Sequence, residues 1–301
     1  MTFSKPALSI SDQRRRMESR GLAVSDPVRA ERYLSAIGYY RLSAYTRPFQ
    51  RDFRTHQFEP DMTFDDVLNL YIFDRQLRLT LLDALERVEV AMRARVNDIM
   101  CSRTGNTHWY LDATLFNTEY EHGRMVQQVE EHQDDFVKSY KQKYTDPAEI
   151  PAWMAVQALS FGAIQKLLKA LGKREQEAIC GTFGFQPRPM VTWLYAMTAL
   201  RNNCAHHART WNRTFHVNLP VGAPTPTTIR APLTEYNKNK LDGYVLVLDT
   251  FMQHVSPGSH WHSRLAKLVQ DYHDDTPHDF HRADLQRRAG HLLTLPVTGA
   301  V

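Results

Sequence analysis

A long stretch without glycine or proline dominates the chain, running from Phe64 to about Arg103. Thr63 can cap its start, and Asp65 and Asp66 suit the positive end of a helix dipole. Apolar residues occupy most faces of the helix that this stretch predicts. They are Leu70, Leu77, Leu81, Ala84 and Val88 on one seam, with Leu68, Ile72, Leu79 and Val90 on the other side. A helix that is apolar on most sides is central to its domain. Helical patterns also recur along the rest of the chain, which predicts an all-α fold.

Glu86, Glu89 and Arg93 are among the charged residues of this central helix. Glu89 and Arg93 are spaced i, i+4, which favours an internal ion pair. The functional alternative is that this set packs behind the segment 201–213 and orients Arg201 or His206.

The segment 201–213, RNNCAHHARTWNR, is the densest polar stretch. It follows an apolar run from Met190 that opens behind Pro187 and Pro189, as helix starts often do. We expect one helix through Arg213. Its buried stripe would be Met190, Trp193, Met197, Leu200, Cys204, Ala208 and Trp211, with Asn202, His206, Arg209 and Arg213 nearly opposite and Arg201 on the shoulder.

One imidazole among several guanidinium groups has a definite chemical use. Histidine has an unperturbed pKa of about 6.5, and arginine binds phosphate oxygens in bidentate fashion. RNA cleavage needs a base for the ribose 2′-hydroxyl and a cation for the phosphate, and it requires no metal in principle. The alternative is a solvated face near a helix C-terminus, where cations interact favourably with the helix dipole.

Near the N-terminus, Tyr39-Tyr40-Arg41 and Tyr45-Thr46-Arg47 alternate aromatic and basic residues. Such side chains can stack on and clamp single-stranded RNA, although tyrosines packed beneath a loop explain the pattern equally. Asp26 followed by Pro27 predicts the start of a helix that ends near Gly38.

Three parts are predicted along the chain: an N-terminal helical and basic segment (1–60), a helical domain (61–272) and a polar, irregular C-terminal tail (273–301). A polar insertion with its own helix is expected at about 105–150. Single helices are expected over 152–171, 238–255 and 262–272.

Composition is consistent with a globular protein that contacts nucleic acid. The net charge is +4, and most of the 37 basic residues are arginine, since only ten are lysine. The three cysteines are far apart and odd in number, so we expect a reducing, cytoplasmic setting with no membrane span. Seven of the fourteen histidines follow residue 253, but no cysteine accompanies them, so we expect no metal site there. Cys204 lies in the apolar stripe, where a thiol is usually inert.

The segment 201–213 resembles the signature of the AbiD/AbiF-like abortive-infection proteins, which belong to the HEPN superfamily. Four further blocks resemble this family in the same order, and the likeness extends over residues 5 to about 270. They are YLSAIGYYRLSAY (33–45), FDRQLRLTLLDALERVEVAMRARV (73–96), HWYLDATLF (108–116) and PAWMAVQALSFGAIQKLLKAL (151–171). A short aromatic and glycine block that ends related chains is absent, which leaves the C-terminal boundary open.

The resemblance implies a HEPN-type helical bundle with additional N-terminal and inserted helices. It also implies metal-independent RNase activity centred on an Arg-x4-6-His motif, here Arg201, Asn202 and His206, without a cofactor. We therefore expect an endoribonuclease that acts as an anti-phage toxin, with His206 as general acid or base. RNA contacts are expected from His207, Arg209, Arg213, Tyr40 and Arg41.

Two alternatives remain: a non-catalytic module that binds RNA or a partner through the same helix, and a protein held inactive by a small structured RNA. A protein antitoxin is also compatible with the sequence. The chain carries one Arg-x4-His, and His207 would lie roughly 100° from His206 on a helix. A second basic group for the scissile phosphate therefore favours a homodimer, which the family resemblance also implies.

Overall fold

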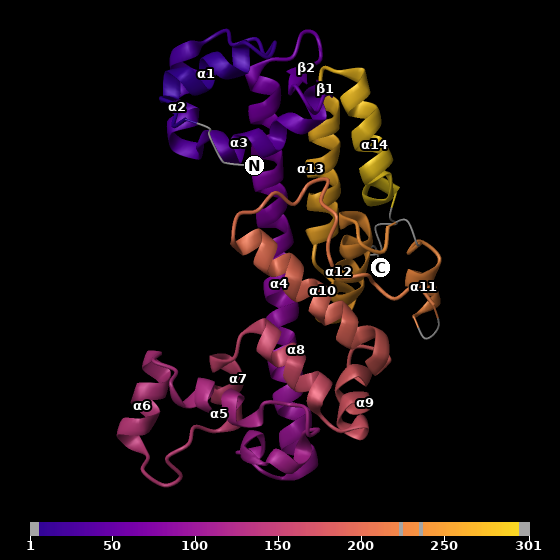
Figure 1. Ribbon diagram of the computed structural model, residues 1–301. Coiled ribbons are helices and arrows are strands. Elements are labelled where there is room, and N and C mark those ends of the chain that lie inside the picture. The colour runs from indigo at the N-terminus through magenta and orange to yellow at the C-terminus, as the bar shows by residue number, and fades with distance from the viewer. Residues whose placement is uncertain (1–5, 223–224, 235–236, 295–301) are drawn as a thin grey trace. The chain divides into compact units, whose positions relative to one another are not determined.

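The computed structural model describes residues 6–222, 225–234 and 237–294. Over these residues the protein is all-α, and the sheet structure that they contain is one short two-stranded hairpin (Figure 1). The predicted fold class is confirmed. No helix among these residues is long and apolar enough to cross a membrane.

The chain divides into two compact units, which are described separately. Of the described residues, unit 1 comprises 6–80, 207–211 and 263–294, and unit 2 comprises 81–206 and 212–262. Two helices have residues in both units: α4 (Phe64–Thr104) and α13 (Trp261–Asp275). The other elements of unit 1 are α1 (Ile10–Glu18), α2 (Pro27–Ile37), α3 (Tyr39–Thr46), the 3-10 turn η1 (Arg47–Phe49), β1 (Gln50–Asp52), β2 (Gln57–Phe58) and α14 (Asp279–Thr294). The other elements of unit 2 are η2 (Trp109–Leu111), η3 (Ala113–Leu115), α5 (His122–Glu130), α6 (Asp135–Lys143), α7 (Ala152–Ala158), α8 (Phe161–Ala170), α9 (Lys173–Gly181), α10 (Pro187–Ala205), α11 (Thr227–Arg230) and α12 (Leu241–Val255).

The start of α4 is fixed by a reciprocal cap. The amide of Asp66 donates to Thr63 Oγ1 (3.2 Å), and the amide of Thr63 donates to the Asp66 carboxylate (2.8 Å). The predicted apolar seam is fully buried, as Leu77, Leu81 and Val88 illustrate. The predicted long helix and its N-terminal signal are therefore confirmed.

The N-terminal helices of unit 1 follow local signals. Asp26 caps α2 by accepting a hydrogen bond from the Arg29 amide (2.9 Å), and Pro27 occupies its first turn, as predicted. Gly38, at φ +86°, separates α2 from α3 in a conformation that favours glycine. Residues Tyr39–Thr46 form α3 instead of the loop that was considered for their tyrosines.

Two predicted segments differ from the structure. The single helix expected over 152–171 is two helices, because Ser160 accepts a hydrogen bond from the Ala163 amide (3.2 Å) and starts α8 anew. The C-terminal tail expected to be irregular contains α14. Its sequence is mostly polar, but His281 and Leu285 are buried, so tertiary packing accounts for the helix.

The polar insertion of unit 2 contains two helices, α5 and α6, where one was expected. Its acidic face is solvated as predicted, since Glu130, Glu131, Asp134 and Asp135 are exposed. After the insertion along the chain comes α10, which packs against α8, α9 and α12.

Candidate functional site

The candidate catalytic residues lie at the C-terminal end of α10. This helix starts at Pro187 as predicted but ends at Ala205, and His206 caps it by donating its amide to the Asn202 carbonyl (2.9 Å). His207 follows at φ +57° and Asn212 at φ +54°. The prediction of one helix through Arg213 is therefore wrong.

The predicted apolar stripe of α10 is confirmed up to the end of the helix at Ala205. Met190, Trp193, Met197, Leu200 and Cys204 are all buried. Trp211 is also buried, but it lies in unit 1, beyond the end of α10. Its ring packs edge-on against the Phe73 ring, with the ring centroids 5.2 Å apart.

A buried carboxylate joins the central helix to Arg201 within unit 2. Glu89 Oε2 lies 3.5 Å from Arg201 Nε, and Glu89 Oε1 accepts a hydrogen bond from Arg93 Nη2 (2.5 Å). Arg93 also donates to the carbonyl oxygens of Val156 (3.1 Å) and Leu159 (3.0 Å) at the end of α7. One carboxylate thus binds two guanidinium groups, and one of these is anchored to a neighbouring helix end.

Glu86 and Glu89, the two acids predicted to orient the site, differ in burial. The side chains of Glu89 and Arg93 are 10% and 13% exposed, whereas Glu86 is exposed. The structure brings Glu89 and Arg93 to Arg201 and leaves Glu86 on the surface. That Glu89 orients Arg201 for catalysis stays a prediction.

The polar groups at the end of α10 are accessible. The Arg201 side chain is 39% exposed, and its Nη1 donates a long hydrogen bond to Asn202 Oδ1 (3.4 Å). Asn202 and His206 are exposed, and so is Arg213, which lies beyond the helix. Arg201, Asn202 and His206 therefore present a guanidinium, an amide and an imidazole to solvent within one and a half helical turns.

Unit 1 holds a second group of predicted residues. Arg41 Nη1 donates to the His207 carbonyl (2.5 Å), and Arg209 Nη1 donates to the Ala44 carbonyl (2.7 Å). These bonds tie residues 207–209 to α3. Tyr40 is 92% exposed, so it is available to a ligand. Arg41 and Arg209 consequently have a structural role besides the predicted contact with RNA.

The residue that sequence reasoning missed is Asp74. Its carboxylate is fully buried in unit 1 and accepts hydrogen bonds from Tyr45 Oη (2.6 Å) and from the amides of Thr210 (3.1 Å) and Trp211 (2.6 Å), besides an ion pair with Arg78. Burial and the adjacent carboxylate both raise the pKa of Tyr45, which keeps its hydroxyl protonated as a donor. The amides of Thr210 and Trp211 therefore donate to Asp74 and not to the backbone carbonyl oxygens that they would bind if α10 continued.

A sequence signal for this network existed. Asp74 and Arg78 are spaced i, i+4, on the same side of the helix as the apolar seam residues Leu70, Leu77 and Leu81. A charged pair on a buried seam indicates that other polar groups complete its hydrogen bonds.

Metal ligands are not grouped in the described part of the chain: no three His, Cys, Asp or Glu side chains there are placed to hold an ion. Of the C-terminal histidines, His281 is buried against Phe49 and Tyr272. The side chain of His291 lies outside the described residues. Cys204 is buried, in keeping with the predicted structural role.

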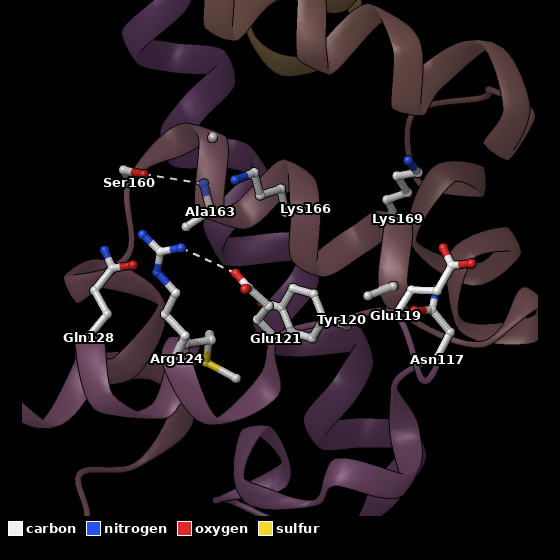
Figure 2. A pocket seen from close by; sticks show the side chains of 13 residues that line it. Asn117, Glu119, Tyr120, Glu121, Arg124, Gln128, Ser160, Ala163, Lys166 and Lys169 are labelled. Carbon is white, nitrogen blue, oxygen red and sulfur yellow. Dashed lines mark hydrogen bonds and ion pairs between the residues drawn. The ribbon is translucent and has the colours of Figure 1, made fainter.

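A cavity of about 490 Å³ lies elsewhere in unit 2, between helix α8 on one side and α5 with the segment that precedes it on the other (Figure 2). Lys166 and Lys169 of α8 and the Arg124–Glu121 ion pair (3.2 Å) line it. None of the predicted site residues contributes to this lining.

The structure thus defines an all-α protein in which an Arg-x4-His motif lies at the C-terminal end of a helix with a buried apolar stripe. The family of Abi-like proteins matches residues 32–212, which is more than half of the chain, and the chain belongs to this family. The matched region includes both α4 and the motif. No curated protein and no solved structure matches the chain.

Proposed function

We propose that this protein is a metal-independent endoribonuclease of the HEPN type that acts in abortive infection. Family membership supports the broad role, since the family is that of Abi-like proteins. The observation that carries the chemistry is the buried Glu89 carboxylate beside Arg201, with Asn202 and His206 exposed in the same stretch of chain.

In this mechanism the side chains have different tasks. His206 exchanges a proton with the ribose 2′-hydroxyl or with the departing 5′-oxygen. Arg201 stabilises the additional negative charge on the phosphate as the 2′-oxygen attacks phosphorus. Asn202 positions the imidazole or the substrate. Glu89, held by Arg93, limits the motion of Arg201, and a group fixed before the reaction stabilises the transition state most effectively.

A second basic group is still required on the other side of the scissile bond. The premise that His206 and His207 share a helix is wrong, since α10 ends at Ala205. The chain nevertheless carries a single Arg-x4-His. A two-fold homodimer that pairs two copies of this motif would supply the complementary acid and base, and it is part of the proposal.

The decisive experiment compares three purified proteins on total RNA in excess EDTA: wild type, His206→Ala and His260→Ala. His260 is an exposed histidine of the same unit and serves as the matched control. We expect His206→Ala to lose at least about 10²-fold in cleavage rate while it retains RNA affinity, and His260→Ala to match wild type.

Equal cleavage by wild type and His206→Ala would overturn the assignment of His206. RNA binding without cleavage by any of the three would favour the alternative, a non-catalytic RNA-binding module. Copurification of a defined small RNA that suppresses cleavage would identify an RNA antitoxin. The proposed setting is the cytoplasm, where RNA is accessible and thiols such as Cys180 remain reduced.

A further inference from the structure

Unit 1 carries an exposed strip of two aromatic and four cationic side chains that the motif at the end of α10 does not include. It consists of Tyr40, Arg41, Arg47, Arg51, Phe53 and Arg54, and we call it the hairpin strip. We propose that the hairpin strip binds single-stranded RNA through its phosphates and base faces, independently of base sequence. This inference rests on the proposed function, because it names the part of the chain that holds the RNA.

The strip begins on one face of α3. Tyr40 and Arg41 lie on α3 and are exposed. Arg47, seven residues after Tyr40, is the exposed first residue of η1, and its backbone keeps the helical conformation of α3. Positions seven apart fall on the same side of a helix after nearly two turns. Tyr40 is 92% exposed, so its ring is open to a base.

The strip continues into the hairpin of β1 and β2. The Arg47 guanidinium lies over the Phe53 ring, 4.8 Å from its centroid, and Phe53 is 56% exposed. A base that stacks on the exposed Phe53 ring would remove this apolar surface from water. A stacked guanidinium beside an open aromatic face is an arrangement that receives a nucleobase next to a phosphate.

Charge in this segment points to an anionic partner. Residues 39–56 contain four arginines and one acid, Asp52. Both oxygens of Asp52 are occupied within the turn, by the Arg54 amide (2.8 Å) and by Thr55 Oγ1 (2.6 Å). Arg51 and Arg54 are exposed, so a ligand can reach their side chains.

The hairpin is anchored well enough to act as a preformed surface. Phe49 and Phe58 are buried at its base, and the Phe58 amide donates to the Arg20 carbonyl (2.9 Å). Gln50 Nε2 donates to Thr46 Oγ1 (2.9 Å), which links the hairpin to the end of α3. A preformed site loses less conformational entropy when it binds a flexible strand.

The partner is single-stranded because the aromatic groups need open base faces. In duplex RNA the bases stack on one another, and the groove that displays their edges does not offer their faces. The strip offers arginines for phosphates and rings for stacking, which discriminate little between bases.

The test uses full-length protein carrying His206→Ala, so that the RNA stays intact, and measures fluorescence anisotropy of a labelled single-stranded oligonucleotide. Phe53→Ala should weaken binding about tenfold, because it removes a surface on which a base stacks. The double variant Arg51→Ala/Arg54→Ala should reduce the slope of log K against log salt by about 1.4, at about 0.7 for each phosphate contact. Duplex RNA of the same sequence should bind at least tenfold more weakly.

Matched controls come from the same unit. Phe280 is an exposed phenylalanine, 44% accessible, and Arg32 and Arg75 are exposed arginines outside the strip. Phe280→Ala and Arg32→Ala/Arg75→Ala should bind as the parent does. Circular dichroism melting checks that all variants are folded, and Phe53→Tyr, which keeps a ring, should restore binding if Phe53→Ala loses it by lost stacking.

The proposal is overturned if Phe53→Ala and the double arginine variant bind single-stranded RNA as tightly as their controls, or if duplex RNA is preferred. The outcome is separable from that of the proposed nuclease. A strip that binds RNA in a protein that never cleaves it would support this inference and refute the proposed activity. Cleavage of RNA by the wild type, together with unchanged RNA binding by the strip variants, would support the proposed activity and refute this inference.

Discussion

Replacing Glu89 by glutamine tests whether the buried carboxylate prepares Arg201 for catalysis. Glu89 and Arg93 are almost fully buried, so the loss of one charge leaves the other without its counter-ion. Breaking a buried pair costs about 3–5 kcal/mol when one partner is removed. The glutamine amide can still accept one hydrogen bond from Arg93, which keeps its bonds to Val156 and Leu159, so about 2 kcal/mol is expected.

The contact with Arg201 adds little to that figure, because the Arg201 side chain is 39% exposed and solvent screens the interaction. Its effect should instead be on catalysis. Displacement of a catalytic group by about 1 Å can lower a rate up to about 10²-fold, so we expect Glu89→Gln to reduce RNA cleavage by about tenfold to 10²-fold.

Thermal unfolding and single-turnover cleavage measure the two effects on the same samples. A loss of 2 kcal/mol should lower the melting temperature by about 4–8 °C for a unit of this size. Glu86→Gln is the control, since Glu86 is exposed on the same helix, and it should change neither quantity. In the double variant Glu89→Gln/Arg201→Ala, cleavage should fall no further than in Arg201→Ala alone. Independent, multiplying losses would refute the idea that Glu89 acts through Arg201.

Three further predictions concern stability, growth and assembly. Asp74→Asn should destabilise the protein by about 3–5 kcal/mol in urea unfolding, because it leaves buried Arg78 unpaired; a loss below 1 kcal/mol would contradict this. Overproduction of wild type should arrest bacterial growth, and Arg201→Ala or His206→Ala should relieve the arrest at equal protein levels, whereas persistent arrest would exclude toxicity through this motif. Light scattering should show a dimer, and a monomer with full, concentration-independent RNase activity would refute the shared site.

Elements with local signals were predictable from the sequence. The cap at Thr63 and the apolar seam define α4, Asp26 and Pro27 start α2, and Pro187 starts α10. These features depend on residues within one helical turn of the boundary, so they can be read without knowing the fold.

Boundaries that depend on distant residues were not predictable. The end of α10 precedes a segment whose amides bind Asp74, which is more than a hundred positions earlier in the chain. The helix α14 depends on the burial of two side chains in a polar sequence. The sequence supplied Glu86 and Glu89 as equal candidates beside Arg93, and only the packing of α4 shows that Glu89 is the one that reaches Arg201.

The chemistry of the cleaved ends tests the central claim most directly. Mass spectrometry of a short oligoribonucleotide after incubation with the protein in EDTA should show a 2′,3′-cyclic phosphate, or its hydrolysed form, on the upstream fragment, because the 2′-oxygen is the nucleophile. A 2′-O-methyl group at the cleaved nucleotide should abolish the reaction there, and His206→Ala should form these fragments at least about 10²-fold more slowly. Upstream fragments that end in a 3′-hydroxyl, or cleavage that persists at the 2′-O-methylated position, would contradict the account.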